Sequence, residues 1–453
     1  MVDEKVCMAG MGYVGLTMSV VLAECGYEVT GVDISQSLVD QLNQGSPHFF
    51  EEALDVRLKN QTRRGRLKVQ TTMPSEEVDV HIISVGTPLI SGTQLPDLSY
   101  LDNVVEDVGR NLKKGGLVCM RSTIPVGGTR NKVLPILEKL SGLVGGKDFN
   151  LAFAPERTVE GKALTELRTN TQIIGGLTEM CVERAMAFYH RLTPTVVRLS
   201  SLEAAELVKL VDNSYRDIRF AFANELSLIT ESLGLDANEV IRSANLHYPR
   251  NNVPVPSPGV GGACLSKDPH ILVDVARQGG YEPKVIPSGR FVNEAIPKLI
   301  VERLDRTMSG LGKNLQEARV LIAGFAFKGE PETTDLRDST TLWLLDAMRE
   351  SAGEVLGYDP VVSSEELEAH GVNVVELPDG LDEVDVLVVA NNHRSYLNWD
   401  LHKISERLNR PAIVYDAWRM FDRSVADSIE DLHYICLLYT SDAADEGLGV
   451  DLG

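Results

Sequence analysis

One cysteine in this chain of 453 residues lies in a segment suited to chemistry. Cys264 follows the glycine-rich run 258–262, and Lys267 and Asp268 come within the next four residues. Glycine permits positive φ angles and lets a ligand approach the backbone. A nearby lysine is one of the groups that lower the pKa of a thiol. The alternative is a glycine-rich turn carrying a buried, inert cysteine, and only the rest of the chain can decide between the two.

Other polar residues follow three predicted strands, Val78–Val85, Leu117–Arg121 and Asn150–Ala154. The carboxylates of Glu156 and Glu160, spaced i, i+4 after the third strand, suit catalysis. Small residues suited to cofactor contact follow the first two strands: Gly86, Thr87, Pro88, Ser122 and Thr123. Each alone could serve turn chemistry. Their shared position at the carboxyl edge of a parallel sheet favours a ligand site.

A long helix is predicted between Ser200 and Gly234, with a serine as N-cap and glycine as stop. Lys209 and Asn213 lie one turn apart on it and face the same way. They belong to a polar stripe: Glu206, Lys209, Asn213 and Arg216. A solvated stripe is the usual alternative. The helix is otherwise apolar, however, and a buried lysine is costly unless it is used.

The N-terminus carries a dinucleotide fingerprint in its full context. A strand at Lys5–Ala9 precedes a helical stretch at Leu16–Glu24, and a second strand, Glu28–Val32, ends at Asp33. The turn between the first strand and the helix contributes Gly10, Gly12, Tyr13, Val14 and Gly15. Such glycines allow a tight turn and close approach of a pyrophosphate, and the acidic residue holds the ribose hydroxyls. The pattern predicts NAD as cofactor.

Strands alternate with helices throughout, which predicts an α/β fold with doubly wound parallel sheets. After a linker at Leu311–Glu317, a second such unit begins at Arg319. Its further predicted strands are Glu354–Tyr358, Val372–Glu376, Val384–Ala390 and Ala412–Asp416. The turn after its first strand offers Lys328 and Arg337 to an anion, although a surface charge cluster is the alternative.

Composition limits the possible partners. The net charge of −21 and pI near 4.9 argue against nucleic acid or an anionic membrane. Six scattered cysteines show neither metal-ligand spacing nor a C-x-x-C pair, which favours a reducing cytoplasm and no metal site. No apolar run reaches transmembrane length, and the chain enters a strand without a signal peptide.

The segment from Cys436 to Gly453 resembles translated read-through of a sequencing adapter. We therefore predict that residues 436–453 are an artefact tail outside the fold. The alternative is a short natural tail.

Taken together, the motifs resemble the UDP-glucose/GDP-mannose dehydrogenase family, the four-electron nucleotide-sugar 6-dehydrogenases. The resemblance runs from Lys5 to about Asp422. It rests on the dinucleotide turn and on these motifs: Gly86-Thr87-Pro88, Ser122-Thr123, Glu206-x-x-Lys209-x-x-x-Asn213, Gly261-Gly262-x-Cys264-x-x-Lys267-Asp268, Phe325-Ala326-Phe327-Lys328 and Asp335-x-Arg337-x-Ser339.

The resemblance implies two Rossmann-like domains joined by a long helix and a small all-α dimerisation domain, hence a homodimer or higher oligomer. The expected domains are an NAD-binding domain over 1–199, a helical central domain over 200–312 and a UDP-sugar domain over 313–435. The expected partners are a UDP-sugar substrate and a second copy of the chain.

It also implies chemistry. Carbon 6 of the sugar loses hydride to give an aldehyde, the Cys264 thiolate adds to it, a second hydride leaves to give a thioester, and water releases the uronate. Lys209 and Asn213 would stabilise oxyanions, while Asp268 and Glu156 would handle water and protons. The resemblance adds Lys267 to the residues expected to bind the cofactor. The substrate residues implied are Glu160, Arg250, Gly261, Lys328, Arg337 and Arg419.

The segment around His247 and Arg250 and the pattern after Lys328 resemble the UDP-N-acetylmannosamine and UDP-N-acetylglucosamine branch. Leu265 follows the cysteine where UDP-glucose dehydrogenases usually have Phe. We therefore expect a UDP-N-acetylhexosamine 6-dehydrogenase for surface polysaccharide synthesis. UDP-glucose is the close alternative. An inactive nucleotide-sugar sensor and a two-electron dehydrogenase are the others, and neither would need Cys264.

Overall fold

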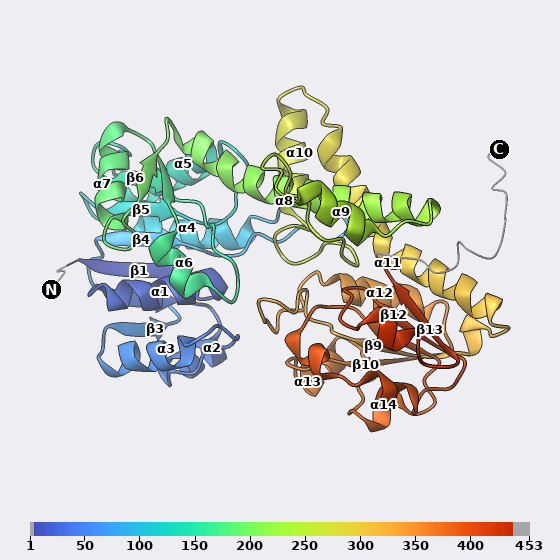
Figure 1. The fold of residues 1–453 in the computed structure, drawn as a ribbon. Helices are drawn as coiled ribbons and strands as arrows, with labels where there is room; N and C mark the ends of the chain where they lie inside the picture. Colours follow the sequence, from blue (N-terminus) through green and yellow to red (C-terminus); the bar gives the residue numbers. More distant parts are fainter. Residues whose placement is uncertain (1–3, 438–453) are drawn as a thin grey trace. The chain divides into compact units, whose positions relative to one another are not determined.

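The computed structural model describes residues 4–437 and divides into two compact units (Figure 1). Unit 1 comprises Met1–Ser214 and Lys267–Pro283, and unit 2 comprises Tyr215–Ser266 and Lys284–Gly453. The chain therefore leaves unit 1 within a helix and returns to it directly after the cysteine-containing loop.

Unit 1 is built on an eight-stranded sheet in the order β3-β2-β1-β4-β5-β6-β7-β8. The strands are β1 Lys5–Ala9, β2 Glu28–Val32, β3 Leu67–Gln70, β4 Val80–Ile83, β5 Leu117–Met120, β6 Asn150–Phe153, β7 Gln172–Gly176 and β8 Val196–Arg198. The first six follow the doubly wound order with its reversal between β1 and β4, where this fold places its ligands.

One strand pair departs from the predicted parallel arrangement. Strands β6 and β7 are antiparallel, with Ala152 opposite Gly176. Only the seven-residue helix α6, Ala163–Thr169, lies between them. A parallel neighbour needs a long crossover that carries the chain back to the starting edge, whereas this connection stays at one edge. The strands predicted for this sheet are parallel, and β7, which the sequence analysis did not predict, adds the one antiparallel pair among the described strands.

Alternating residues of the strands feed two hydrophobic cores, one on each face of the sheet. Cys119 packs in the first core and its neighbour Val118 in the second. The first core includes side chains of α1 Tyr13–Glu24, α3 Leu54–Arg63, α6 and α7 Glu179–Tyr189. The second includes side chains of α4 Ser99–Asn111 and α5 Leu134–Ser141. Helix α2, Gln36–Asn43, follows β2, and α10, Asp268–Gln278, belongs to the returning segment.

The predicted long helix is α8, Leu202–Ser232, and its last eighteen residues belong to unit 2. Two further helices of unit 2 are α9, Ala237–Asn245, and α11, Val285–Gly310. The linker predicted at Leu311–Glu317 ends in a short 3-10 turn at Leu315–Glu317.

The second sheet is parallel in the order β10-β9-β11-β12-β13. Its strands are β9 Arg319–Ala323, β10 Glu354–Tyr358, β11 Val386–Val389, β12 Ala412–Asp416 and β13 Leu432–Cys436. Helices α11 and α12 Thr340–Arg349 pack in the core of one face, and α14 Leu401–Ser405 and α15 Arg423–Ala426 in that of the other. The short helix α13 is Ser364–Ala369.

Two predictions failed in this sheet. Val372–Glu376 is not a strand, because it pairs only around Gly357, through one isolated bridge at Val374. Cys436, assigned to the artefact tail, ends β13 opposite Asp416 and is buried, because this apolar strand completes the sheet edge. The rest of the predicted tail, 438–453, lies outside the described residues.

Within residues 4–437, the structure contains no helix with both the length and the apolar character that crossing a membrane requires.

Candidate active site

The dinucleotide turn of unit 1 has the geometry that its glycines predict. Gly10 adopts φ +91°, and a Cβ on Gly15 would lie 1.8 Å from the Gly10 carbonyl oxygen. A Cβ on Gly12, by contrast, would meet no atom within 4 Å. Gly12 is also the N-cap of α1 and provides no side-chain cap, so the first amides of the helix remain available to an anion.

Asp33 closes this cradle at the end of β2. One carboxylate oxygen accepts a hydrogen bond from the amide of Met11 at 3.0 Å, and the other accepts one from Ser35 at 3.1 Å. The carboxylate is thus fixed between the glycine turn and the start of α2. These features fit NAD. The open space at Gly12 and the uncapped start of α1 suit its pyrophosphate, and the acidic residue after β2 suits its ribose.

Tyr13 is tied to a residue that the sequence analysis missed. Its hydroxyl donates to Glu51 Oε2 at 2.5 Å, and the Gly161 amide donates to the same oxygen at 2.7 Å. Burial and the hydrogen bond to Glu51 raise the pKa of Tyr13, so the phenol stays neutral. Glu51 joins the dinucleotide turn to the half-buried loop of Glu160. It follows no strand, so nothing in its local sequence marks it.

The hydroxyl residues at the sheet edge bond to the backbone. Thr87 donates to the carbonyl of Thr123 at 2.8 Å, and Ser122 donates to that of Val85 at 2.7 Å. These bonds connect the loops after β4 and β5. Between them, Gly86 leaves open space where a side chain would stand. The hydroxyls of Thr87 and Ser122 therefore fix the backbone of these two loops, whereas Gly86 and Pro88 remain candidates for cofactor contact.

Glu206 belongs to the polar stripe of α8, and the sequence suggested no function for it. It holds the loop that contains Gly127 and Thr129. Its carboxylate oxygens accept from the amides of Gly127 and Thr129 at 2.6 and 2.8 Å. Burial raises the pKa of Glu206 despite these bonds. The start of α8 thereby anchors the loop that follows Ser122-Thr123.

Glu156 is a buried carboxylate held as an anion. Its Oε2 pairs with Arg121 at 3.3 Å, and its Oε1 accepts from the amide and hydroxyl of Thr158. Burial alone would raise the pKa of Glu156, but the charges of Arg121 and Lys209 and the bonds from Thr158 outweigh it and lower the pKa. An ionised, weakly basic carboxylate is better suited to orienting water than to accepting a proton.

The predicted catalytic residues of unit 1 form one buried group. Lys209 donates through Nζ to the carbonyl of Glu156 at 2.8 Å. One turn further along α8, Asn213 donates to Asp268 Oδ2 at 2.6 Å, and Lys267 donates to Oδ1 at 2.5 Å. Asp268 is fully buried. Three residues of the stripe are thus buried, and the solvated alternative holds only for Arg216.

In unit 2, Cys264 is exposed while Val260 and Leu265 around it are buried. The buried, inert cysteine considered from the sequence is therefore excluded. The thiol stands at the surface of a loop whose two ends are held in the interior.

This loop packs against the turn that follows β9. A Cβ on Gly261 would lie 2.0 Å from the carbonyl oxygen of Asp338, so only glycine fits there. That carbonyl accepts from the amide of Gly262 at 2.8 Å, and the Asp338 carboxylate accepts from the hydroxyl of Ser266 at 3.0 Å. Asp338 itself has φ +52°. The cysteine loop and the predicted anion-binding turn thus form one surface.

The predicted substrate residues of unit 2 are only partly gathered there. Lys328 Nζ lies 5.2 Å from the centre of the Phe327 ring, which also packs on Gly262. Arg337 is exposed and pairs with Asp335 at 2.6 Å.

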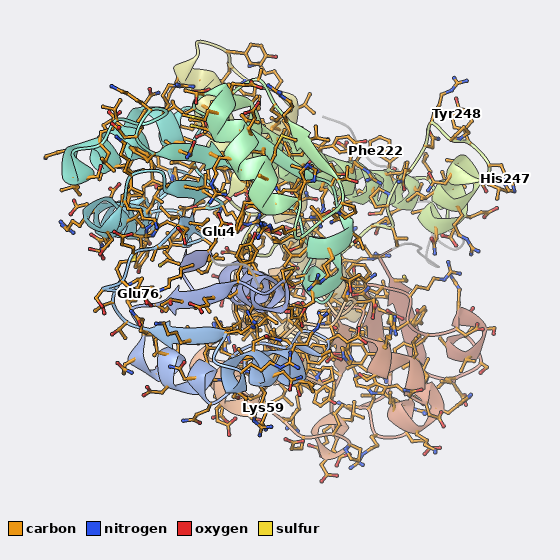
Figure 2. All side chains as sticks on the ribbon, turned by 90° about the vertical axis from the view of Figure 1, so that its left-hand side faces the viewer. Glu4, Lys59, Glu76, Phe222, His247 and Tyr248 are labelled. Carbon is orange, nitrogen blue, oxygen red and sulfur yellow. The ribbon has the colours of Figure 1, made fainter. Side chains whose placement is uncertain are left out.

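Two further arginines occupy other positions. Arg419 has φ +56° and bonds to Asp236 at 3.3 Å. Arg250 stacks on Tyr248 in an exposed loop, at whose outer tip Figure 2 shows His247 and Tyr248.

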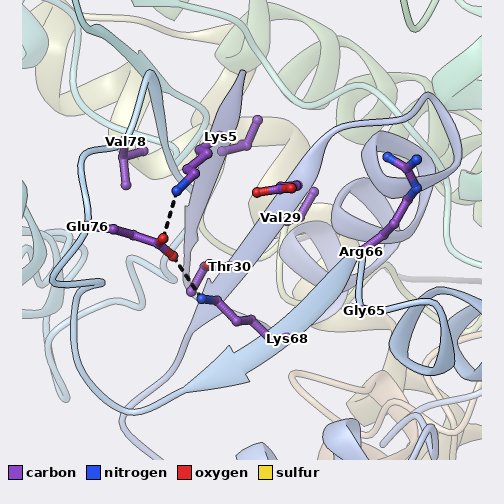
Figure 3. Close-up of a pocket in the computed structure, with 10 residues that line it drawn as sticks. Lys5, Val29, Thr30, Gly65, Arg66, Lys68, Glu76 and Val78 are labelled. Atoms are coloured by element: carbon purple, nitrogen blue, oxygen red, sulfur yellow. Dashed lines mark hydrogen bonds and ion pairs between the residues drawn. The ribbon is translucent and has the colours of Figure 1, made fainter. Parts of the chain in front are cut away.

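A separate pocket of about 180 Å³ lies at the amino end of the first sheet, where β1 and β2 begin (Figure 3). In it Glu76 pairs with Lys5 at 2.7 Å and with Lys68 at 2.8 Å. Both lysines thus share one carboxylate, and the dinucleotide turn is at the other end of the strands. The pocket is therefore not part of the candidate active site.

Comparison with known proteins decides the family. Three successive parts of the chain match the UDP-glucose/GDP-mannose dehydrogenase family: its NAD binding domain over residues 4–193, its central domain over 203–295 and its UDP binding domain over 321–423. The chain belongs to this family. It is an NAD-dependent nucleotide-sugar dehydrogenase, and its UDP binding domain supports a UDP-sugar as substrate.

The family member UDP-N-acetyl-D-mannosamine dehydrogenase of Campylobacter jejuni is 34% identical over 411 residues, 88% of this chain and 98% of the relative. The solved UDP-D-ManNAc dehydrogenase of Pyrococcus horikoshii has a TM-score of 0.87 and 31% identity, covering 96% of this chain and 99% of that one. A UDP-glucose dehydrogenase of Pyrobaculum islandicum has a TM-score of 0.84 at 26% identity, with 96% and 98% covered.

Proposed function

We propose that this dehydrogenase oxidises carbon 6 of UDP-N-acetyl-D-mannosamine to the carboxylate, with Cys264 as covalent nucleophile. The observation that carries the proposal is the packing of the cysteine loop on the turn after β9. Through Gly262 and Asp338, it attaches an exposed thiol to the part of the chain that matches a UDP binding domain.

The proposed reaction divides the work among the chain's own residues. The thiolate of Cys264 adds to the carbonyl carbon of the aldehyde, a carbon–sulfur bond forms, and the carbonyl electron pair moves to oxygen. Lys209 and Asn213 donate hydrogen bonds to oxygens that develop charge at carbon 6. Loss of hydride gives a thioester, which water cleaves to the carboxylate and the thiol.

Two molecules of NAD⁺, bound one after the other, would each take up one of the two hydrides that this oxidation releases. The dinucleotide turn, with Gly12 and Asp33, would hold each of them. Asp268, with bonds from Lys267 and Asn213, and Glu156, paired with Arg121, would orient the hydrolytic water.

The choice of sugar rests on the relatives and on Leu265, which replaces the Phe usual in UDP-glucose dehydrogenases. UDP-N-acetyl-D-glucosamine is the nearest chemical alternative. UDP-glucose is a second candidate, because the structurally similar Pyrobaculum islandicum protein is named for it.

We also infer a homodimer built on α8. Tyr215, Phe222 and Ile229 recur at heptad spacing on this helix and, with Leu233, are each about half or more exposed. An apolar stripe of this kind on a helix is typical of a surface that pairs with another helix. A second copy of the chain is the occupant that we propose.

The test of the substrate is NADH formation by the purified protein with NAD⁺ and UDP-ManNAc, UDP-GlcNAc or UDP-glucose in parallel. Turnover that is fastest with UDP-ManNAc supports the proposal. Turnover with UDP-glucose alone would retain the chemistry and overturn the sugar. Binding without turnover in all three would favour the inactive sensor.

A further inference from the structure

The loop that carries Cys264 is held from beneath by a buried arginine. Arg290 on α11 is 2% exposed. Its Nη1 donates to the carbonyl of Val260 at 3.1 Å and to that of Leu265 at 3.2 Å. These carbonyls lie on either side of Cys264 in the chain. One guanidinium thus joins the two arms of the loop.

The arginine is itself fixed by charge. The same Nη1 pairs with Asp217 Oδ1 on α8 at 2.7 Å, and Nη2 pairs with Glu294 at 3.0 Å. Asn293 donates to Asp217 Oδ1 at 2.8 Å and to its carbonyl at 3.0 Å. Asp217 and Asn293 are fully buried. A buried cation of this kind is costly to place unless it is paired and hydrogen-bonded.

The same network reaches the start of the loop. Asn224, seven residues after Asp217 on α8, accepts from the amide of Ser257 at 2.7 Å and donates to Asn293 at 2.9 Å. A Cβ on Gly259, which has φ +90°, would lie 2.7 Å from the Asn293 carbonyl oxygen, so the loop backbone rests directly on α11. These contacts all lie within unit 2.

We propose that Arg290, held by Asp217 and Asn293, is a positioning residue for the Cys264 thiol, and that it acts on the second oxidation more than on the first. The proposal rests on the proposed function in one respect: only the step that follows thiol addition needs the loop in one geometry. The carbon–sulfur bond demands close alignment, and misplacement of a reacting group by about 1 Å costs about 100-fold in rate.

The discriminating variant is Arg290→Lys, which retains the positive charge but loses the planar guanidinium. Its Nη1 bonds to both carbonyls and to Asp217 while Nη2 holds Glu294, and a lysine cannot reproduce this arrangement. The matched control is Arg303→Lys on the same helix. Arg303 is similarly buried and bonds to Glu231 and to the Cys436 carbonyl, at the other end of α11. A second test variant, Asn224→Ala, releases the Ser257 amide and leaves the Arg290–Asp217 pair in place.

Amide hydrogen exchange of the peptide 257–266 is measured first, on the full-length protein without substrate. We expect exchange about tenfold or more faster in Arg290→Lys and Asn224→Ala, since a hydrogen bond from a charged donor is worth about that factor. Arg303→Lys should lower the melting temperature without changing this peptide. Unchanged exchange in both test variants would overturn the proposal that Arg290 and its partners hold the cysteine loop in place, whatever the protein's substrate is.

Kinetics supplies the second readout. In Arg290→Lys we expect uronate formation to fall about 100-fold, KM for the UDP-sugar to stay within about threefold, and aldehyde to accumulate in a hydroxylamine trap. Equal loss of aldehyde and uronate formation would contradict a greater effect on the second oxidation than on the first. If the unmodified protein oxidised no UDP-sugar, the proposed function would fail. The exchange experiment would still show whether Arg290 holds the cysteine loop in place.

Discussion

Cys264 differs from the other cysteines in its environment. Four of them are buried, Cys25 is half-buried, and Cys264 alone among the six is exposed. Burial raises the pKa of Cys7 to about 12 and that of Cys119 to about 11, so these thiols stay protonated and unreactive at neutral pH. Exposure and the glycine-rich backbone therefore support the proposal that Cys264 is the nucleophile.

Replacing the nucleophile tests this assignment. We expect Cys264→Ser to stop uronate formation, with a loss of at least about 1,000-fold, because serine is a far weaker nucleophile than a thiolate. Aldehyde should appear in a trapping reagent, since the first oxidation needs no thiol. Cys25→Ser serves as control and should retain activity. Rapid uronate formation by Cys264→Ser would remove the thiol from the mechanism.

His81 provides a prediction about stability. Both ring nitrogens are buried and lack a hydrogen-bond partner within residues 4–437. Burial, with a smaller contribution from Lys113, lowers the pKa of His81 to about 4. The unfolded chain, with a histidine pKa near 6.5, binds the proton more readily, so stability is lost as pH falls from about 6.5 towards 4.

The expected loss is about 3 kcal/mol in the free energy of unfolding at full effect. Urea titrations at pH 7 and pH 5 should detect about 2 kcal/mol of it, because the folded-state pKa near 4 lies below this range. His81→Leu should flatten this dependence, because it removes the titrating group and leaves an apolar side chain in the core. If the free energy of unfolding fell equally between pH 7 and pH 5 in both proteins, other titrating groups would account for the pH dependence.

At the scale of single residues, the sequence predicted those that occupy a motif and missed those that support it. Cys264, Lys209 and Asn213 stand at spacings that chemistry requires. Arg290 and Glu51 act through backbone groups far away in the chain, and their neighbours give no indication of this. Glu206 was noticed as part of a stripe, but its bonds to the loop after Ser122 depend on tertiary contacts.

At the scale of elements, α8 carries residues with different tasks along its length. Glu206, Lys209 and Asn213 are buried in unit 1, whereas Phe222 and Ile229 are exposed in unit 2. One helix can do this because its faces and its successive turns meet different surroundings. The apolar residues at its exposed turns are the basis of the proposed dimer.

Phe222, labelled in Figure 2, offers the test. We expect Phe222→Glu to halve the mass measured by light scattering at low micromolar concentration, because a charge in an apolar interface costs several kcal/mol. Leu397→Glu, at an exposed apolar residue of a short 3-10 turn in unit 2, is the control and should leave the mass unchanged. A monomeric unmodified protein, or a dimer unaffected by Phe222→Glu, would contradict the α8 interface.

Elements with strong apolar runs were predictable. Lys5–Ala9, Glu28–Val32, Glu354–Tyr358 and Ala412–Asp416 have the predicted bounds in the structure. Val372–Glu376 has a similar composition but bridges only at Gly357, because partners decide whether an extended segment becomes a strand. The antiparallel β7 was missed for a similar reason, since direction depends on where the connection returns.

At the scale of the whole molecule, the order of motifs along the chain predicted the two Rossmann-like sheets and the NAD-dependent chemistry. It could not predict that the chain would cross from one compact unit to the other within α8 and again after Ser266. The three domain bounds expected from the sequence therefore stay predictions. The crossing places Cys264 and Asp268, four residues apart, in different units.

The measurement that tests the central claim most directly is the number of NADH molecules formed per UDP-sugar consumed, with the uronate quantified in the same reaction. Oxidation through a Cys264 thioester predicts about two NADH and one uronate for each sugar. A ratio of one, with aldehyde as the final product, would contradict the account and leave a two-electron dehydrogenase in its place.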